Sequence, residues 1–122
     1  MRQSFAVLAA AVLLSAIVAP LASAGSTPKP LAVTIKDNSF TPKTKKIKTG
    51  TKVTWTWKGA EAHNVTLVTG GVKGAPKGIK ASKYSSKTQT KGTFVRTLKT
   101  TGKYFFVCTL HAGMQQTLTV TK

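Results

Sequence analysis

The chain has very few of the side chains that enzymes commonly use for catalysis. Its 122 residues include one cysteine, two histidines and two acidic residues, Asp37 and Glu61. A lone cysteine cannot form an internal disulfide, so it is a reactive thiol, an intermolecular bridge or a ligand. Two carboxylates leave no obvious acid–base pair or catalytic triad. We therefore expect no catalytic residues and no enzymatic activity.

The N-terminal segment has the pattern of a secretory signal peptide. Arg2 supplies a positive charge, residues 5–19 are nearly all apolar, and Ala22-Ser23-Ala24 fits the small-residue rule for cleavage. We expect residues 1–24 to be removed and the protein to be exported, to a periplasm or to the cell envelope and exterior. An uncleaved membrane anchor is the alternative, since the apolar run approaches the ~17–25 residues that span a bilayer. Pro20 favours cleavage.

Negative charge is scarce, and the positive charge is almost all lysine. Nineteen basic residues against two acidic ones give a formal net charge of +17. Such a charge attracts anionic partners in a salt-dependent way, among them acidic proteins, anionic envelope polymers and lipid headgroups. Arginine, which dominates nucleic-acid recognition, occurs only at Arg2 and Arg96, and the protein is expected to be exported, so we expect no nucleic-acid partner. The lysines can equally be a solvated surface that keeps the protein soluble.

Residues 25–122 lack the spacing of apolar residues that is typical of a helix. Apolar and polar residues alternate there instead, as in β-strands. Alternating or β-branched runs cover residues 31–35, 52–57, 64–68, 93–98, 103–107 and 117–121. About seven or eight short strands with turn signals between them predict an all-β, antiparallel Greek-key β-sandwich. We assign residues 25–30 as a short N-terminal tether and residues 31–122 as a single domain. The Gly- and Lys-rich residues 70–92 form either a functional loop or a spacer.

Three metal-binding side chains lie close together near the C-terminus. Cys108, His111 and Met114 form a Cys-x-x-His-x-x-Met motif, and His63 is the only other histidine. A thiolate, two imidazoles and a thioether are soft or borderline donors, which favour copper over magnesium or calcium. Two histidines, one cysteine and a weakly bound methionine are the ligands of blue-copper electron-transfer sites. The sequence therefore predicts a copper site that uses its only cysteine and both of its histidines.

Several segments resemble the cupredoxins, the type 1 blue copper proteins that include plastocyanin and amicyanin. The similar segments are Val33-Thr34-Ile35, His63-Asn64-Val65, Gly102-Lys103-Tyr104-Phe105-Phe106-Val107-Cys108 and Met114-Gln115-Gln116-Thr117-Leu118-Thr119-Val120. The resemblance implies one copper ion per chain, with His63, Cys108 and His111 as equatorial ligands and Met114 as the weak axial ligand. It also implies a monomeric one-electron carrier between extracytoplasmic redox partners, which for this cationic chain we expect to have acidic docking surfaces.

The resemblance extends to a residue that supports the site, and it has three departures. Asn64 resembles the family asparagine that ties the first ligand segment to the cysteine loop, and its partner here would be Thr109; the alternative is a simple turn asparagine. Ala62, Leu110 and Ala112 stand where relatives often have proline. We therefore expect a ligand loop that proline does not make rigid.

Two other functions fit the same sequence. A copper storage or delivery protein would bind the ion tightly without rapid electron exchange. A cationic envelope-binding module with a vestigial metal site would use its lysines and not its cysteine.

Overall fold

The computed structural model describes residues 27–122 of the chain. The expected signal peptide, residues 1–24, therefore lies outside the described residues, as do residues 25–26 of the tether. The described chain has eight strands and one short 3₁₀ helix: β1 (Leu31–Lys36), β2 (Ser39–Thr41), β3 (Thr44–Lys48), β4 (Thr51–Trp57), β5 (Thr66–Val68), η1 (Ala81–Tyr84), β6 (Gly92–Leu98), β7 (Gly102–Val107) and β8 (Gln115–Thr121). Within residues 27–122, no helix has the length and apolarity needed to cross a membrane.

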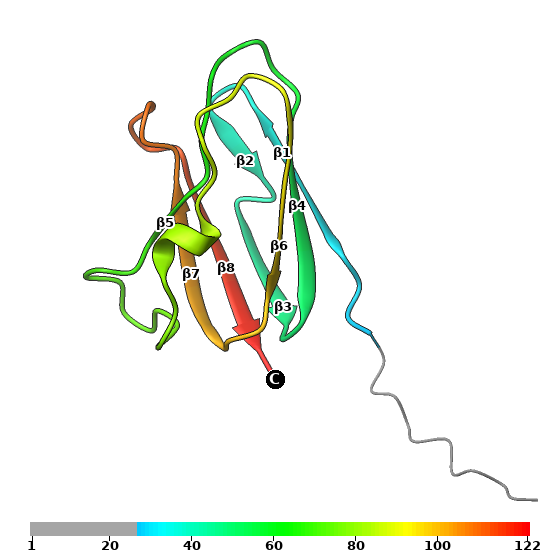
Figure 1. The fold of residues 1–122 in the computed structure, drawn as a ribbon, viewed down its shortest axis with the longest axis vertical. Coiled ribbons are helices and arrows are strands. Elements are labelled where there is room, and N and C mark those ends of the chain that lie inside the picture. The colour runs from blue at the N-terminus through cyan, green and yellow to red at the C-terminus, as the bar shows by residue number, and fades with distance from the viewer. Residues whose placement is uncertain (1–26) are drawn as a thin grey trace, which may run out of the picture.

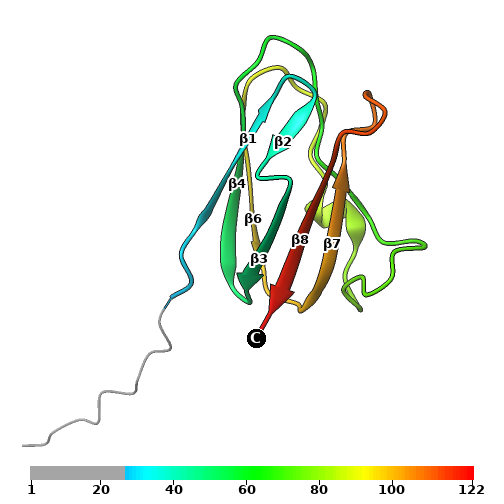
Figure 2. The ribbon, with the colours of Figure 1, turned by 180° about the vertical axis from the view of Figure 1, so that it is seen from behind.

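The strands form two four-stranded sheets that pack face to face (Figures 1 and 2). Their strand orders are β2-β1-β4-β6 and β3-β8-β7-β5. The predicted all-β sandwich is confirmed. We expected antiparallel strands, but each sheet contains one parallel pair: β1 with β4, and β3 with β8. Parallel neighbours need a crossover connection. Here the chain leaves the first sheet after β2, forms β3 in the second sheet and returns as β4.

All six alternating or β-branched runs became strands, and two further strands, β2 and β3, were not predicted. Strands β1, β4, β6, β7 and β8 coincide with the expected runs to within two residues, whereas β5 is only three residues long. Strand β3 reads Thr-Lys-Lys-Ile-Lys, and Ile47 is its single buried side chain. One apolar residue is too few to show a two-residue period, which is why the sequence did not predict this strand.

The core lies between the sheets and is centred on Trp55. The indole ring of Trp55 lies 5.4 Å from the Phe94 ring and 5.0 Å from the Phe106 ring, between centroids. Its Nε1 donates a hydrogen bond of 2.9 Å to Gln116 Oε1. The buried Gln116 in turn donates from Nε2 to the Pro42 carbonyl at 2.8 Å. A polar chain therefore links β4, β8 and the β2–β3 connection inside the apolar core.

The long segment between β5 and β6 covers the free edge of β5. The backbone N–H of Leu67 donates to Ser85 Oγ at 3.0 Å, and that of Val65 to Ser86 Oγ at 2.9 Å. The Ser86 N–H donates to the Val65 carbonyl at 2.7 Å. Part of the expected loop therefore satisfies the backbone of a sheet edge.

Both loops that carry candidate ligands lie at one end of the sandwich. Residues 58–65 connect β4 to β5, and residues 108–114 connect β7 to β8. The tether, residues 27–30, and the C-terminus lie at the opposite end (Figure 1). This arrangement separates the candidate metal site from the point where the chain enters the fold.

The buried polar chain through Gln116 gives a first prediction. Replacement of Gln116 by leucine should lower the free energy of unfolding by about 2 kcal/mol, because the Trp55 N–H would stay buried without an acceptor. Urea unfolding followed by tryptophan fluorescence measures the change. Gln115→Leu, at the exposed neighbouring position of the same strand, is the control and should change stability by less than about 0.5 kcal/mol. Equal unfolding free energies for the two variants would contradict the assignment.

Candidate metal centre

The loop between β7 and β8 brings three of the predicted ligands to one end of the sandwich. Cys108 directly follows β7, His111 lies at the turn of the loop, and Met114 immediately precedes β8. The Cys108 N–H donates to the Met114 carbonyl at 3.0 Å, and the Met114 N–H to the His111 carbonyl at 3.3 Å. Gly113 has a φ of +79°, a left-handed conformation that costs glycine little. These contacts close the loop into a tight turn.

His63 reaches the same place from the β4–β5 connection. Its backbone N–H donates to the Gln89 carbonyl at 3.0 Å, and its carbonyl accepts from the Gln89 N–H at 3.0 Å. The same carbonyl accepts a second hydrogen bond of 3.0 Å from Trp57 Nε1. The side chain is only 1% exposed. A fixed backbone therefore presents the His63 ring from inside the protein.

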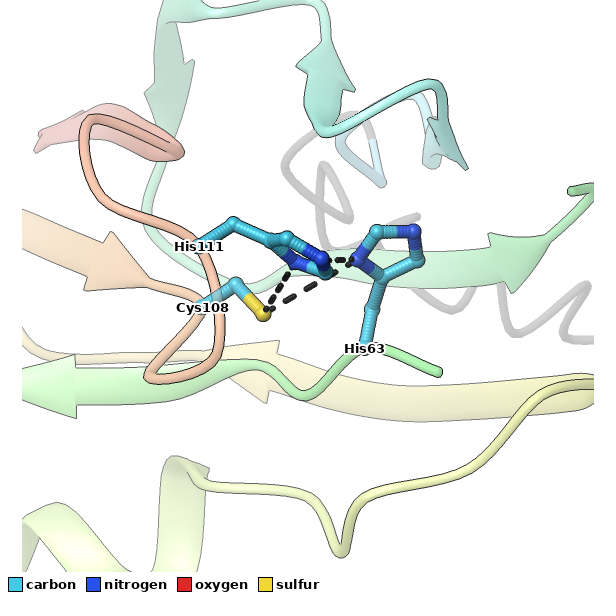
Figure 3. A group of neighbouring side chains, drawn as sticks. All are labelled: His63, Cys108 and His111. Carbon is cyan, nitrogen blue, oxygen red and sulfur yellow. Dashed lines mark hydrogen bonds between the residues drawn. The ribbon is translucent and has the colours of Figure 1, made fainter. Parts of the chain in front are cut away.

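Three donor atoms converge at the site, as Figure 3 shows. The two Nδ1 atoms of His63 and His111 are 3.2 Å apart, and Cys108 Sγ lies 3.9 Å from the first and 3.6 Å from the second. A point equidistant from all three lies about 2.1 Å from each, which matches metal–nitrogen and metal–sulfur bonds of ~2.0–2.3 Å. The spacing therefore fits one transition-metal ion. Met114 is buried at the end of the same loop.

The side chain of Asn64 joins three segments around the site. Its Oδ1 accepts hydrogen bonds from the Thr109 N–H at 3.1 Å and from Thr66 Oγ1 at 2.8 Å. Its Nδ2 donates to Thr109 Oγ1 at 2.7 Å and to Thr88 Oγ1 at 3.0 Å. Asn64 and Thr109, which the family resemblance pairs, are thus in direct contact. The His63 segment, the cysteine loop and residue 88 are held together by one amide.

Burial favours the neutral form of the His63 imidazole. It lowers the pKa of the imidazole below its ordinary value of 6.5, the nearby His111 lowers it further, and Glu61 partly offsets both effects. The Nε2 atom of His63 has no hydrogen-bond partner among the described residues. A metal binds the neutral imidazole, so burial favours the form that the site needs.

Glu61 lies beside the second histidine. Its Oε2 is 3.5 Å from His111 Nε2, but its side chain is 66% exposed, so this contact contributes little to stability. The sequence alone did not indicate that Glu61, Thr88 and Gln89 lie at the site. The position of Glu61, two residues before His63, could have indicated that it lies near the site. Gln89 acts through its backbone and Thr88 through a long-range contact, and neither leaves a local pattern.

Comparison with known proteins identifies the family. The sequence profile described as copper binding proteins, plastocyanin/azurin family, matches residues 30–121. The chain belongs to this family. The predicted resemblance to cupredoxins and the predicted copper cofactor are thereby confirmed. A search of the curated proteins gives no match.

Several solved cupredoxin structures have the same fold. A mutant plastocyanin of fern is 27% identical over 74% of this chain and 99% of its own, with a TM-score of 0.63. A pseudoazurin from Sinorhizobium meliloti is 25% identical over 77% of this chain and 75% of its own, with a TM-score of 0.61. These likenesses agree with the family assignment.

A larger protein contains the same fold as one part. The copper-containing nitrite reductase of Thermus scotoductus SA-01 is 20% identical over 76% of this chain, with a TM-score of 0.60. This chain spans only 22% of the reductase chain. At this identity the likeness concerns the fold alone.

The contacts of Asn64 predict its effect on the metal. Asn64→Ala should lower the copper affinity by about 10–100-fold, because the two ligand segments lose their direct link. Competition with a chelator of known affinity measures the change. Thr90→Ala, an exposed substitution in the neighbouring segment, is the control and should leave the affinity unchanged. An unchanged affinity in the Asn64 variant would show that the backbone alone positions the ligands.

The lowered pKa of His63 predicts how the stability of the metal-free protein depends on pH. As the pH falls from 7 to 5, the unfolded chain takes up a proton near pH 6.5, whereas folded His63 resists protonation until lower pH. The unfolded state therefore binds more protons, and this group should lower the stability by at most about 1.4 kcal/mol per pH unit. Urea unfolding at several pH values measures this effect. His63→Gln should be less sensitive over the same range, and identical pH profiles would contradict the shift.

Proposed function

We propose that the protein is an exported type 1 copper protein that carries single electrons between redox partner proteins. His63 Nδ1, Cys108 Sγ and His111 Nδ1 would hold the copper ion, and Met114 would supply a weakly bound thioether. The main support is the convergence of these three donor atoms, 3.2–3.9 Å apart, in a chain of the copper-binding family.

The ligand set accounts for one-electron chemistry with little movement. Copper, when bound, supplies a Cu(II)/Cu(I) couple that thiolate and imidazole donors stabilise in both oxidation states. The protein keeps those donors in place through the Asn64 hydrogen bonds and the pairing of Cys108 with Met114. A site held in this way has little to rearrange when the charge changes. His63 and Cys108 are nearly inaccessible to solvent, which excludes water from the donor atoms.

The route for electrons to and from partners passes through His111. Its side chain is 25% exposed, whereas the other two donors are buried. Leu110, at 52% exposure, is the one large exposed hydrophobic side chain in the described part of the chain. We infer that a redox partner docks over Leu110 and meets the exposed edge of the His111 ring.

The remaining assignments follow from the sequence. A net charge of +17 suits partners with acidic docking surfaces. With Asp37 and Glu61 as its only acidic side chains, the protein is inferred to have no catalytic activity of its own. Residues 1–24 are assigned as a cleaved signal peptide and residues 31–122 as the copper-binding domain, which we take to be monomeric. Mass spectrometry of the exported protein would test the cleavage site.

A visible absorption spectrum tests the metal assignment directly. Residues 25–122 with one equivalent of Cu(II) should develop an intense blue band that ascorbate bleaches and reoxidation restores. Cys108→Ser should abolish the band, because the charge-transfer donor is lost. A colourless wild-type protein would show that the Cys108 site does not assemble, and would favour a cationic envelope-binding module.

The axial assignment predicts a change in reduction potential. Met114→Gln should keep the copper and lower the potential by about 100 mV, since an amide oxygen favours Cu(II) more than a thioether does, and ~59 mV corresponds to a tenfold change. Cyclic voltammetry measures the shift. An unchanged potential would show that Met114 is not a ligand. Slow electron self-exchange in the wild-type protein, measured by NMR line broadening, would favour copper storage or delivery over electron transfer.

A further inference from the structure

Acidic and basic side chains are distributed unequally over the molecule. The two acidic side chains, Asp37 and Glu61, both line one cavity of about 400 Å³ beside His63, at the copper end. Among residues 27–122, the one contact within 4 Å between a carboxylate side chain and a basic side chain is formed there, between Glu61 and His111. The lysines elsewhere in the described chain therefore have no carboxylate side chain beside them.

One group of lysines surrounds the edge strand β3. We call this group the β3 lysine surface: Lys29, Lys45, Lys46, Lys48 and Lys103. All five residues are exposed. Strand β3 is the outer strand of its sheet, next to β8 and then β7 (Figure 2). Across the sheet, Lys46 pairs with Thr119 of β8, and Thr119 pairs with Lys103 of β7.

Two hollows meet along β3 and are lined by these lysines. The first, about 470 Å³, is lined by Thr44, Lys45, Lys46, Lys103, Thr117 and Thr119. The second, about 460 Å³, shares Lys45 and Lys46 and adds Lys29, Lys48 and the apolar side chains of Pro28, Pro30, Leu31 and Ile47. Neither hollow is lined by an acidic residue. Lys48 Nζ donates one hydrogen bond, to the Lys122 backbone oxygen at 3.0 Å. The surface thus combines cationic charge, with no acidic side chain in either hollow, with a small apolar area.

The β3 lysine surface lies far from the metal centre. Strand β3 runs parallel to the distal part of β8, from Thr117 to Thr121. Thr119 lies five residues beyond Met114 in the sequence, about 17 Å at ~3.4 Å per strand residue. The tether enters the fold at the same distal end (Figure 1). A partner bound along β3 would therefore leave Leu110 and His111 accessible.

We propose that the β3 lysine surface binds an anionic phospholipid bilayer and orients the copper end away from it. Clusters of about four to eight basic residues are attracted to anionic lipid headgroups. Lysine acts there as a mobile point charge on phosphate, whereas bidentate recognition of a defined protein carboxylate favours arginine. Pro28, Pro30 and Leu31 place apolar atoms beside the charges, which suits the boundary between headgroups and acyl chains. The binding does not require the copper site.

Cosedimentation of the copper-loaded protein with lipid vesicles tests the proposal. Vesicles of phosphatidylglycerol and phosphatidylcholine should bind the protein in a salt-sensitive way, and pure phosphatidylcholine should not. The variant K45E/K46E/K103E should bind the anionic vesicles at least about tenfold more weakly, given the contribution expected of each lysine. The control variant K58E/K87E/K91E makes the same change in net charge at exposed positions outside this surface and should lose less than about threefold. Circular dichroism checks that both variants fold.

Three outcomes, from cosedimentation and from two companion measurements, would overturn the proposal. Equal losses in the two variants would show that only net charge matters. Binding to long-chain polyphosphate but not to anionic vesicles would identify an envelope polymer as the partner. Slower reduction of the vesicle-bound copper protein than of the free protein by an uncharged reductant would show that the copper end faces the bilayer. Because cosedimentation does not depend on colour, failure of the copper assignment would be recognised separately.

Discussion

The four hydrogen bonds of the Asn64 side chain are the contacts on which the metal centre depends most. They connect the segment that carries His63, the loop that carries the other donors, and the segment between η1 and β6. The loop has Leu110 and Ala112 where relatives often have proline, so its shape is not fixed by restricted backbone torsions. A buried amide that satisfies all of its partners gives the same rigidity by another means. The hydrogen bonds of Asn64 thus compensate for the absence of proline in the ligand loop.

Much of the fold and the donor set could be predicted from the sequence, because both leave local signals. Alternating residues of β4 and β8 reflect one buried face and one solvated face, and the Cys-x-x-His-x-x-Met spacing is contained in a single loop. Strand β3 and the parallel pairings left no such signal. Their stability comes from contacts between residues that are distant in the sequence, such as Val33 with Trp55 in one parallel pair and Ile47 with Val120 in the other. Thr88 and Gln89 were missed for the same reason.

The segment between β5 and β6 has a structural role that its composition concealed. Rich in glycine, lysine and small polar residues, it was equally compatible with a spacer and a functional loop. Ser85 and Ser86 satisfy the backbone of the short strand β5, and Gln89 pairs with His63. A free strand edge is prone to pair with other chains, and this segment covers it. The segment that protects the edge through Ser85 and Ser86 also holds the first histidine through Gln89, so sheet integrity and ligand placement are coupled.

The hydrogen bond between the Cys108 N–H and the Met114 carbonyl extends the β7–β8 pairing by one step beyond the sheet. Residues 109–113 therefore form a closed unit whose ends are fixed by the sandwich. Lengthening such a closed turn costs little conformational entropy. Evolution can insert or delete residues there, changing the spacing of the donors, while the sandwich below stays the same. The length of the ligand turn can therefore change without a change in the sandwich.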